Sequence, residues 1–103
     1  MSDPDFVRTD DGGEPPWSER HAWALARADG IELSELHWWM IRFVRRHWLD
    51  YGTPPLMRVT VAAMRRETAE TDASSRTLYR LFADGPIKTA CRYAGVPPPD
   101  VCI

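Results

Sequence analysis

The stretch SELHWWMIRFVRRHWLDYGTPP, residues 34–55, decides the fold class. Ser34 is a favourable N-cap, Gly52 ends the helix, and Thr53-Pro54-Pro55 cannot continue it. Between them, apolar and aromatic side chains recur every three or four residues, which predicts one long helix with a broad buried face. The residues expected on or beside that face are His37, Ile41, Val44, Trp48, Tyr51, Leu36, Met40 and Phe43.

Four shorter helices are predicted around this one, each bounded by cap or breaker residues. They span about 18–30, 56–67, 74–84 and 86–95. In the first three of these, the side chains expected to face inward are Ala22, Trp23, Leu25, Ala26, Val59, Ala63, Met64, Leu78, Leu81 and Phe82. The sequence therefore predicts a mainly α fold, a compact bundle of about five short helices.

The domain organisation follows from the length of 103 residues, which suits one domain with a single core. We assign residues 1–95 to that helical domain, with residues 1–16 as an irregular lead-in. A weak β-hairpin signal surrounds Asp11-Gly12 in the lead-in. Residues 96–103 are expected to form a flexible C-terminal arm. No run of eighteen apolar residues is present, so no membrane insertion is expected.

The net charge of −2 conceals an asymmetry along the chain. Residues 1–37 carry three Arg against nine Asp and Glu, whereas residues 38–92 carry ten Lys and Arg against five Asp and Glu. The basic middle suits an anionic partner surface and equally suits an ordinary solvated face.

The N-terminal residues are acidic and lack the apolar segment of a secretory signal, so a cytoplasmic location is expected. In that reducing compartment, two cysteines are more often reactive than permanently cross-linked. No spacing of Cys and His suits a metal, and no cofactor motif is present, so neither a metal nor a cofactor is expected.

Cys91 lies on the predicted fifth helix and shares an apolar stripe with Ile87 and Ala94. The simpler interpretation is a small buried core residue, since buried free cysteines are common. Lys88 and Arg92 flank the stripe, and their charges could favour a thiolate at its edge.

Cys102 has no comparable place in a core. The prolines at 97–99 favour extended geometry of about 3.1 Å per residue, so the thiol can project on the order of 20 Å beyond Gly95. An exposed thiol on an extendable arm suggests a carrier that delivers sulfur into a partner's pocket. Asp100 disfavours the thiolate, so Cys102 is expected to react best where cations replace this environment.

Two segments resemble the DsrC/TusE family of sulfur-relay proteins: IELSELHWWMIRFVRRHWLDYGTPPLMRV (31–59) and LYRLFADGPIKTACRYAGVPPPDVCI (78–103). The specific part is the terminal pattern GP-x-K-x-A-C-x-x-AG-[LV]-P-x-P-x-x-C-[IV]. The resemblance implies a small helical fold, often with an N-terminal hairpin, whose flexible arm carries a persulfide on Cys102.

The resemblance also distinguishes two branches of the family. The DsrC branch, a partner of dissimilatory sulfite reductase, has a second cysteine where Cys91 stands, and the TusE branch, which passes sulfur toward tRNA 2-thiouridine synthesis, typically lacks it. By that criterion the chain resembles DsrC more closely, with Cys91 as the resolving thiol. Implied partners are sulfur-donor and sulfur-acceptor proteins, namely a sulfite reductase-like or TusBCD-like complex. Pro98 and Val101 stand where Lys and Gly are frequent, which makes the arm stiffer and less basic.

Two other functions are compatible with parts of the sequence. The second and third helices could form a helix-turn-helix that binds DNA, with Arg58, Arg65 and Arg66 facing phosphates. The negative net charge and the absence of a recognition cluster argue against nucleic acid binding. The three histidines are scattered, so a protein co-substrate in sulfurtransferase chemistry is favoured over a stand-alone enzyme.

Overall fold

The computed structural model describes residues 17–99, and every structural statement below concerns that part of the chain. Within it there are five helices and no strand, which confirms the predicted mainly α fold. The helices are α1 (Glu19–Asp29), α2 (Glu35–Tyr51), α3 (Met57–Glu67), α4 (Ser75–Leu81) and α5 (Pro86–Ala94). The predicted hairpin around Asp11-Gly12 and the outer half of the predicted arm, residues 100–103, lie outside the described residues. None of the five helices is long and apolar enough to cross a membrane.

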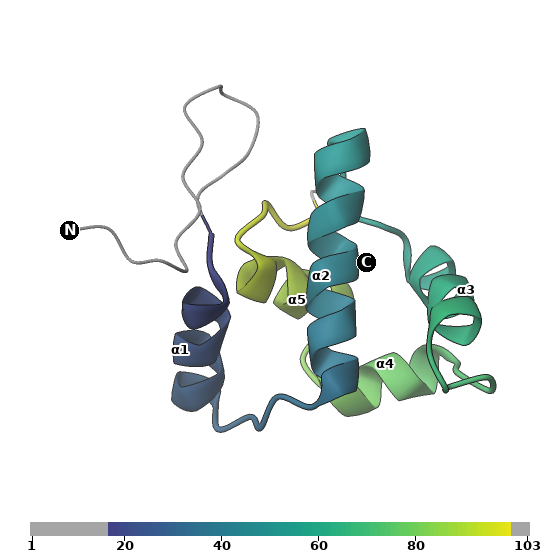
Figure 1. Ribbon diagram of the computed structural model, residues 1–103, viewed down its shortest axis with the longest axis horizontal. Coiled ribbons are helices and arrows are strands. Elements are labelled where there is room, and N and C mark those ends of the chain that lie inside the picture. The colour runs from purple at the N-terminus through teal and green to yellow at the C-terminus, as the bar shows by residue number, and fades with distance from the viewer. Residues whose placement is uncertain (1–16, 100–103) are drawn as a thin grey trace.

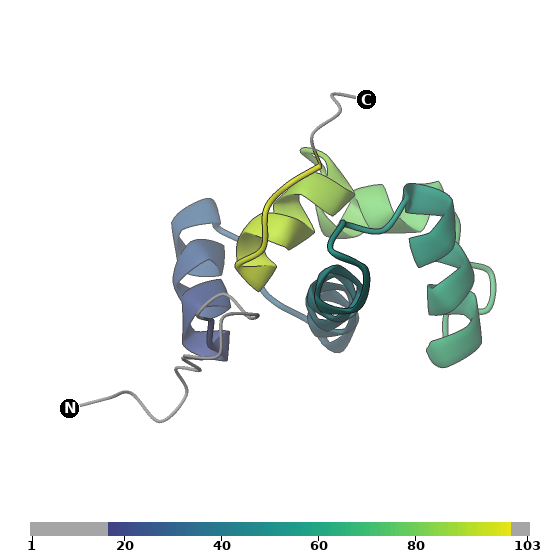
Figure 2. The same cartoon turned by 90° about the horizontal axis from the view of Figure 1, so that it is seen from above.

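Helix α2 is the central element of the fold. It runs through the middle of the domain, with α1 on one side and α3 on the other (Figure 1). Helix α5 packs along α2 more extensively than any other pair of helices packs together, and α1 and α4 also contact α5. The view from above shows α5 beside α2 (Figure 2). Helix α5 is therefore held by three neighbouring helices.

The core contains side chains from all five helices. Each large apolar group removed from water contributes about 1.5–3 kcal/mol, so this packing outweighs the modest helix propensity of the many aromatic residues on α2. The largest fully buried apolar side chains are Tyr93, Phe82, Met40, Ile41, Met64, Leu78 and Val44.

Helix α2 begins with a capping box in which a histidine takes the place of the usual glutamate or glutamine. The Oγ of Ser34 accepts a hydrogen bond from the backbone N–H of His37 at 3.3 Å. In return, the Nδ1 of His37 accepts one from the Ser34 N–H at 3.1 Å. The other ring nitrogen, Nε2, donates to the Leu81 carbonyl at 3.0 Å. His37 therefore joins the start of α2 to the end of α4.

Three side chains predicted to face inward are exposed instead: Trp23 by 50%, Tyr51 by 71% and Val59 by 39%. Helix α1 buries only the small residues Ala22 and Ala26, which leaves Trp23 at the edge, near Trp38. Tyr51 is the last residue of α2, whose end extends beyond its neighbours (Figure 1).

On α3, the polar residue Thr60 takes a core position that the sequence pattern did not predict. Its hydroxyl donates to the Leu56 carbonyl at 3.0 Å, so burial leaves no polar group unsatisfied. The buried face of α3 is consequently Thr60, Val61, Ala63 and Met64, and Val59 points outward.

Candidate functional site

Cys91 lies on the buried face of α5 and is 0% exposed. Ile87, Ala90 and Ala94 are buried with it, as the stripe in the sequence predicted. Removal from water disfavours the thiolate and raises the pKa of Cys91 to about 12. In this conformation Cys91 is therefore a protonated core thiol and a poor nucleophile.

Lys88 and Arg92 lie on the exposed side of α5. Both border a hollow of about 330 Å³, together with Asp29 and Asp84. The guanidinium of Arg92 donates a hydrogen bond to the Asp29 carboxylate, so its charge is already partnered. That these two cations favour a thiolate stays a prediction, one that applies to a state in which Cys91 has left the core.

Asp29, the last residue of α1, connects that helix to α5. Its Oδ2 accepts hydrogen bonds from the Tyr93 hydroxyl at 2.8 Å and from Arg92. The Tyr93 hydrogen bond, with help from Arg92, holds the pKa of Asp29 below its ordinary value. Burial and the neighbouring Asp29 charge raise the pKa of Tyr93. Tyr93 is fully buried, so this contact fixes the orientation of α5 relative to α1.

The last four carbonyls of α5 all accept hydrogen bonds, although a helix end leaves such groups without helical partners. Two of these carbonyls accept from the chain that follows: the Gly95 N–H donates to the Arg92 carbonyl at 3.3 Å, and the Val96 N–H donates to the Cys91 carbonyl at 3.1 Å. The other two accept from side chains: Trp17 Nε1 donates to the Tyr93 carbonyl at 2.8 Å, and Arg45 Nη1 donates to the Ala94 carbonyl at 2.9 Å. In addition, His21 Nε2 lies within hydrogen-bonding distance of the Arg92 carbonyl, at 3.2 Å.

Trp17, Arg45 and Gly95 form a small stack at this helix end, which we call the clamp. The Arg45 guanidinium lies 5.1 Å from the centre of the Trp17 ring. The same ring lies against Gly95, whose φ of 69° is in the left-handed region. Arg45 is only 7% exposed, so its charge is held in the protein by the ring and by the Ala94 carbonyl.

Among the described residues after α5, Pro97 is the first exposed one. Val96, which the sequence assigned to the arm, is buried in the core and hydrogen-bonded to Cys91. Pro97 and Pro98 are exposed. Cys102 lies outside the described residues, so the structure places neither its thiol nor its distance from Cys91.

Sequence reasoning missed four residues of this helix end, which are Trp17, Arg45, His21 and Tyr93. Arg45 carried a signal, because it falls four residues after Ile41 and three before Trp48, within the apolar stripe of α2. A charge at such a position indicates a buried partner. His21 and Tyr93 carried no comparable signal, since their partners are far away in the sequence.

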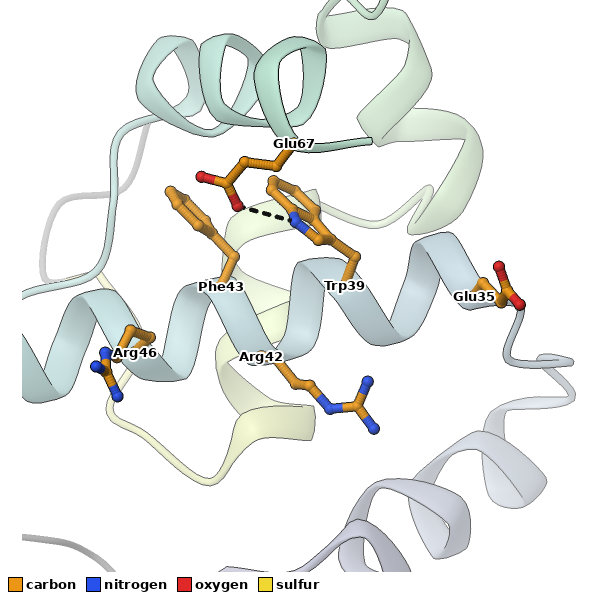
Figure 3. Close-up of a pocket in the computed structure, with 6 residues that line it drawn as sticks. All are labelled: Glu35, Trp39, Arg42, Phe43, Arg46 and Glu67. Atoms are coloured by element: carbon orange, nitrogen blue, oxygen red, sulfur yellow. Dashed lines mark hydrogen bonds between the residues drawn. The ribbon is translucent and has the colours of Figure 1, made fainter. Parts of the chain in front are cut away.

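A second hollow, open and of about 440 Å³, lies between α2 and the end of α3 (Figure 3). Trp39 and Phe43 stack along it with ring centres 5.0 Å apart, and Glu67 accepts a hydrogen bond from the Trp39 indole. Arg65 and Arg66, two of the arginines considered for DNA contacts, are engaged nearby with the Ala73 carbonyl and with Glu67.

These features define a class: a small helical domain that presents a C-terminal segment from a firmly held helix end, with one cysteine buried inside that helix. A family model described as DsrC like protein matches residues 13–103. The chain therefore belongs to the DsrC-like family, and the family resemblance seen in its sequence is confirmed.

Individual relatives come from both branches of the family. Sulfurtransferase TusE of Salmonella typhimurium is 48% identical over 87 residues, which cover 84% of this chain and 80% of the relative. The crystal structure of the oxidized gamma-subunit of dissimilatory sulfite reductase (DsrC) from Archaeoglobus fulgidus matches with a TM-score of 0.74 and 35% identity, over 100% of this chain and 91% of that one. The NMR structure of Allochromatium vinosum DsrC gives a TM-score of 0.68 at 32% identity, over 96% and 98%. A role in sulfur relay is therefore supported for this chain.

Proposed function

We propose that this protein carries sulfane sulfur on Cys102 between a donor protein and an acceptor protein, with Cys91 as the resolving thiol. The observation that supports the proposal most is that the matched family region, residues 13–103, includes both cysteines and the segment between them. The firmly held end of α5 supports it further, because it gives the following segment a fixed origin.

The proposed resolving step balances without an added oxidant. Cys102 bears a persulfide, Sγ–SH, received from the donor. The Cys91 thiolate attacks the Sγ of Cys102, the bond between the two persulfide sulfurs breaks, and hydrosulfide leaves with the electron pair. The product is a Cys91–Cys102 disulfide, which a thiol reductant returns to two thiols.

A simpler, TusE-like transfer is the second candidate, as in sulfur delivery for tRNA 2-thiouridine synthesis. Here an acceptor thiol attacks the terminal sulfur of the Cys102 persulfide and takes it, and Cys91 has no chemical role. The complete burial of Cys91 and its raised pKa favour this candidate, as does the 48% identity to a sulfurtransferase TusE.

The test is brief polysulfide treatment of the reduced protein, followed by peptide mass spectrometry, with Cys91→Ala and Cys102→Ala as matched variants. Added sulfur is expected first on the Cys102 peptide, because Cys91 is buried and protonated. Loading should be lost in Cys102→Ala and kept in Cys91→Ala. If Cys102→Ala loads as fully as the wild type, the carrier proposal fails.

The two candidates separate at the next step. In the resolving mechanism, the loaded wild type releases hydrosulfide and gains an internal link, and loaded Cys91→Ala does neither. In the TusE-like mechanism, Cys91→Ala passes sulfur to an acceptor thiol as fast as the wild type. Both mechanisms need partner proteins of the sulfite reductase-like or TusBCD-like kind. Both also need thiols kept reduced, for which we propose the cytoplasm.

A further inference from the structure

The clamp lies at the end of the turn that begins with Cys91. Residues 91–94 form one helical turn of α5. The four carbonyls of that turn accept hydrogen bonds from the backbone N–H groups of Gly95 and Val96 and from the side chains of Trp17, His21 and Arg45. The Val96 side chain is packed into the same core as Cys91. Within this turn, Trp17 holds the Tyr93 carbonyl and Arg45 holds the Ala94 carbonyl.

Cys91 is 0% exposed, so its thiol must leave the core before it can react with a residue of the following segment. A disulfide requires the two α-carbons to lie within about 4.4–6.8 Å, with the Cβ atoms directed toward one another. In the closed structure the Cys91 side chain is directed into the core, and Val96, buried in the same core, precedes the exposed prolines in the chain. Opening the last turn of α5 brings Cys91 to the end of the helix and releases Val96 together with it.

We propose that Trp17 and Arg45 are positioning residues that hold the last turn of α5 closed over Cys91, and that Cys91 becomes reactive only when this clamp opens locally. The biological role of this opening rests on the proposed sulfur chemistry. Its test measures only the reactivity of the Cys91 thiol. Local opening is distinct from global unfolding, because it breaks contacts at one helix end and leaves the packing of α2, α3 and α4 intact.

The contacts that Arg45 and Trp17 make in the clamp differ in strength. Arg45 is a buried cation at a helix C-terminus, where a positive charge is favourable, and hydrogen bonds to charged groups are among the stronger ones in proteins. Trp17 adds a neutral hydrogen bond and a ring surface. Loss of Arg45 should therefore increase the open population more than loss of the Trp17 N–H.

The experiment follows the alkylation of Cys91 by iodoacetamide in a Cys102→Ala background. The sequence has two cysteines, so Cys91 is the one thiol that remains in this variant. Arg45→Met removes the hydrogen bond to Ala94 and keeps most of the volume, and Trp17→Phe removes only the indole donor. Arg42→Met is the matched control, because Arg42 lies on the same helix, is exposed and pairs with Glu19 instead. We expect labelling to rise roughly tenfold to a hundredfold with Arg45→Met, by a smaller factor with Trp17→Phe, and not with Arg42→Met.

Low concentrations of urea distinguish local opening from global unfolding. Opening of one helical turn exposes little surface, so its labelling rate should change little with urea, whereas labelling through global unfolding rises steeply. The proposal is overturned if the labelling rates of the background protein and of Arg45→Met, at every urea concentration, equal those expected from global unfolding alone. It is also overturned if Arg42→Met accelerates labelling as much as Arg45→Met. Neither outcome bears on whether Cys102 carries sulfur, which the polysulfide experiment tests separately.

Discussion

The indole of Trp17 lies directly against Gly95, although 78 positions separate them in the sequence. A Cβ atom at Gly95 would be 2.8 Å from Cδ1 of Trp17 and 3.4 Å from its Cβ and Cγ. Gly95 also has a φ of 69°, a backbone conformation that residues with a Cβ rarely adopt. Glycine is therefore required here for two independent reasons, its backbone conformation and the closeness of the ring.

Substitution of Gly95 by alanine should lower the free energy of unfolding by about 2–4 kcal/mol, the sum of left-handed strain and displacement of the ring. Gly52→Ala is the matched control: its φ of 72° is similar, and no atom lies within 4 Å of the position of its Cβ. That variant should lose only about 1–2 kcal/mol. Urea denaturation of both variants measures the difference, and equal losses would show that the contact with Trp17 contributes nothing.

Acidification should destabilise the protein through His37. Burial holds the pKa of His37 below its ordinary value of 6.5, against a smaller opposing effect of the Leu81 carbonyl. As the pH falls below about 6.5, the unfolded chain binds a proton at this residue before the folded chain does, so stability is lost. Protonation of Nδ1 would also remove the acceptor for the Ser34 N–H.

The measurement compares urea midpoints at about pH 7.5 and about pH 5.5 for the wild type and His37→Gln, since glutamine can keep the capping box. The wild type should lose more stability between these values than the variant does. An equal loss in both proteins would assign the effect to other groups.

A Cys91–Cys102 link should form within one molecule and should be easy to reduce. Ten residues separate the two cysteines, so closing the loop costs little chain entropy, and a cross-link of this size would stabilise the fold by roughly 3 kcal/mol in the entropic model. Its formation also requires Cys91, 0% exposed in the reduced domain, to leave the core, and this cost opposes the gain. We expect a reduction potential above the roughly −300 mV of structural disulfides, and a trisulfide would relax the geometry further.

Redox titration of the wild type against glutathione, followed by intact mass, measures this potential. Cys91→Ala and Cys102→Ala serve as controls that cannot close the loop. Exclusive formation of intermolecular dimers, or a bond that resists glutathione as a structural disulfide does, would contradict the switch-like role of Cys91.

The helices could be predicted from sequence because their signals are local. Helix α2 lies between its caps Ser34 and Gly52, and α5 begins at Pro86 and ends before Gly95. The apolar stripe on α5 likewise predicted the burial of Cys91. The exposure of Trp23, Tyr51 and Val59 could not be predicted in this way. It depends on which neighbouring element each helix face contacts, and the periodicity of the sequence carries no such information. The clamp could not be predicted for the same reason: its hydrogen bonds join residues 49 or more positions apart.

The burial of Val96 has a consequence for how partners can bind. Val96 is held in the core, Pro97 is the first exposed residue after it, and only three residue steps lead from Pro99 to Cys102. Each step spans at most about 3.6 Å, so the α-carbon of Cys102 stays within about 11 Å of that of Pro99. If Cys102 carries the sulfur, its donor and its acceptor must both come that close to the same end of the domain. The two partners then compete for one binding place, and the protein must leave the first before it can bind the second.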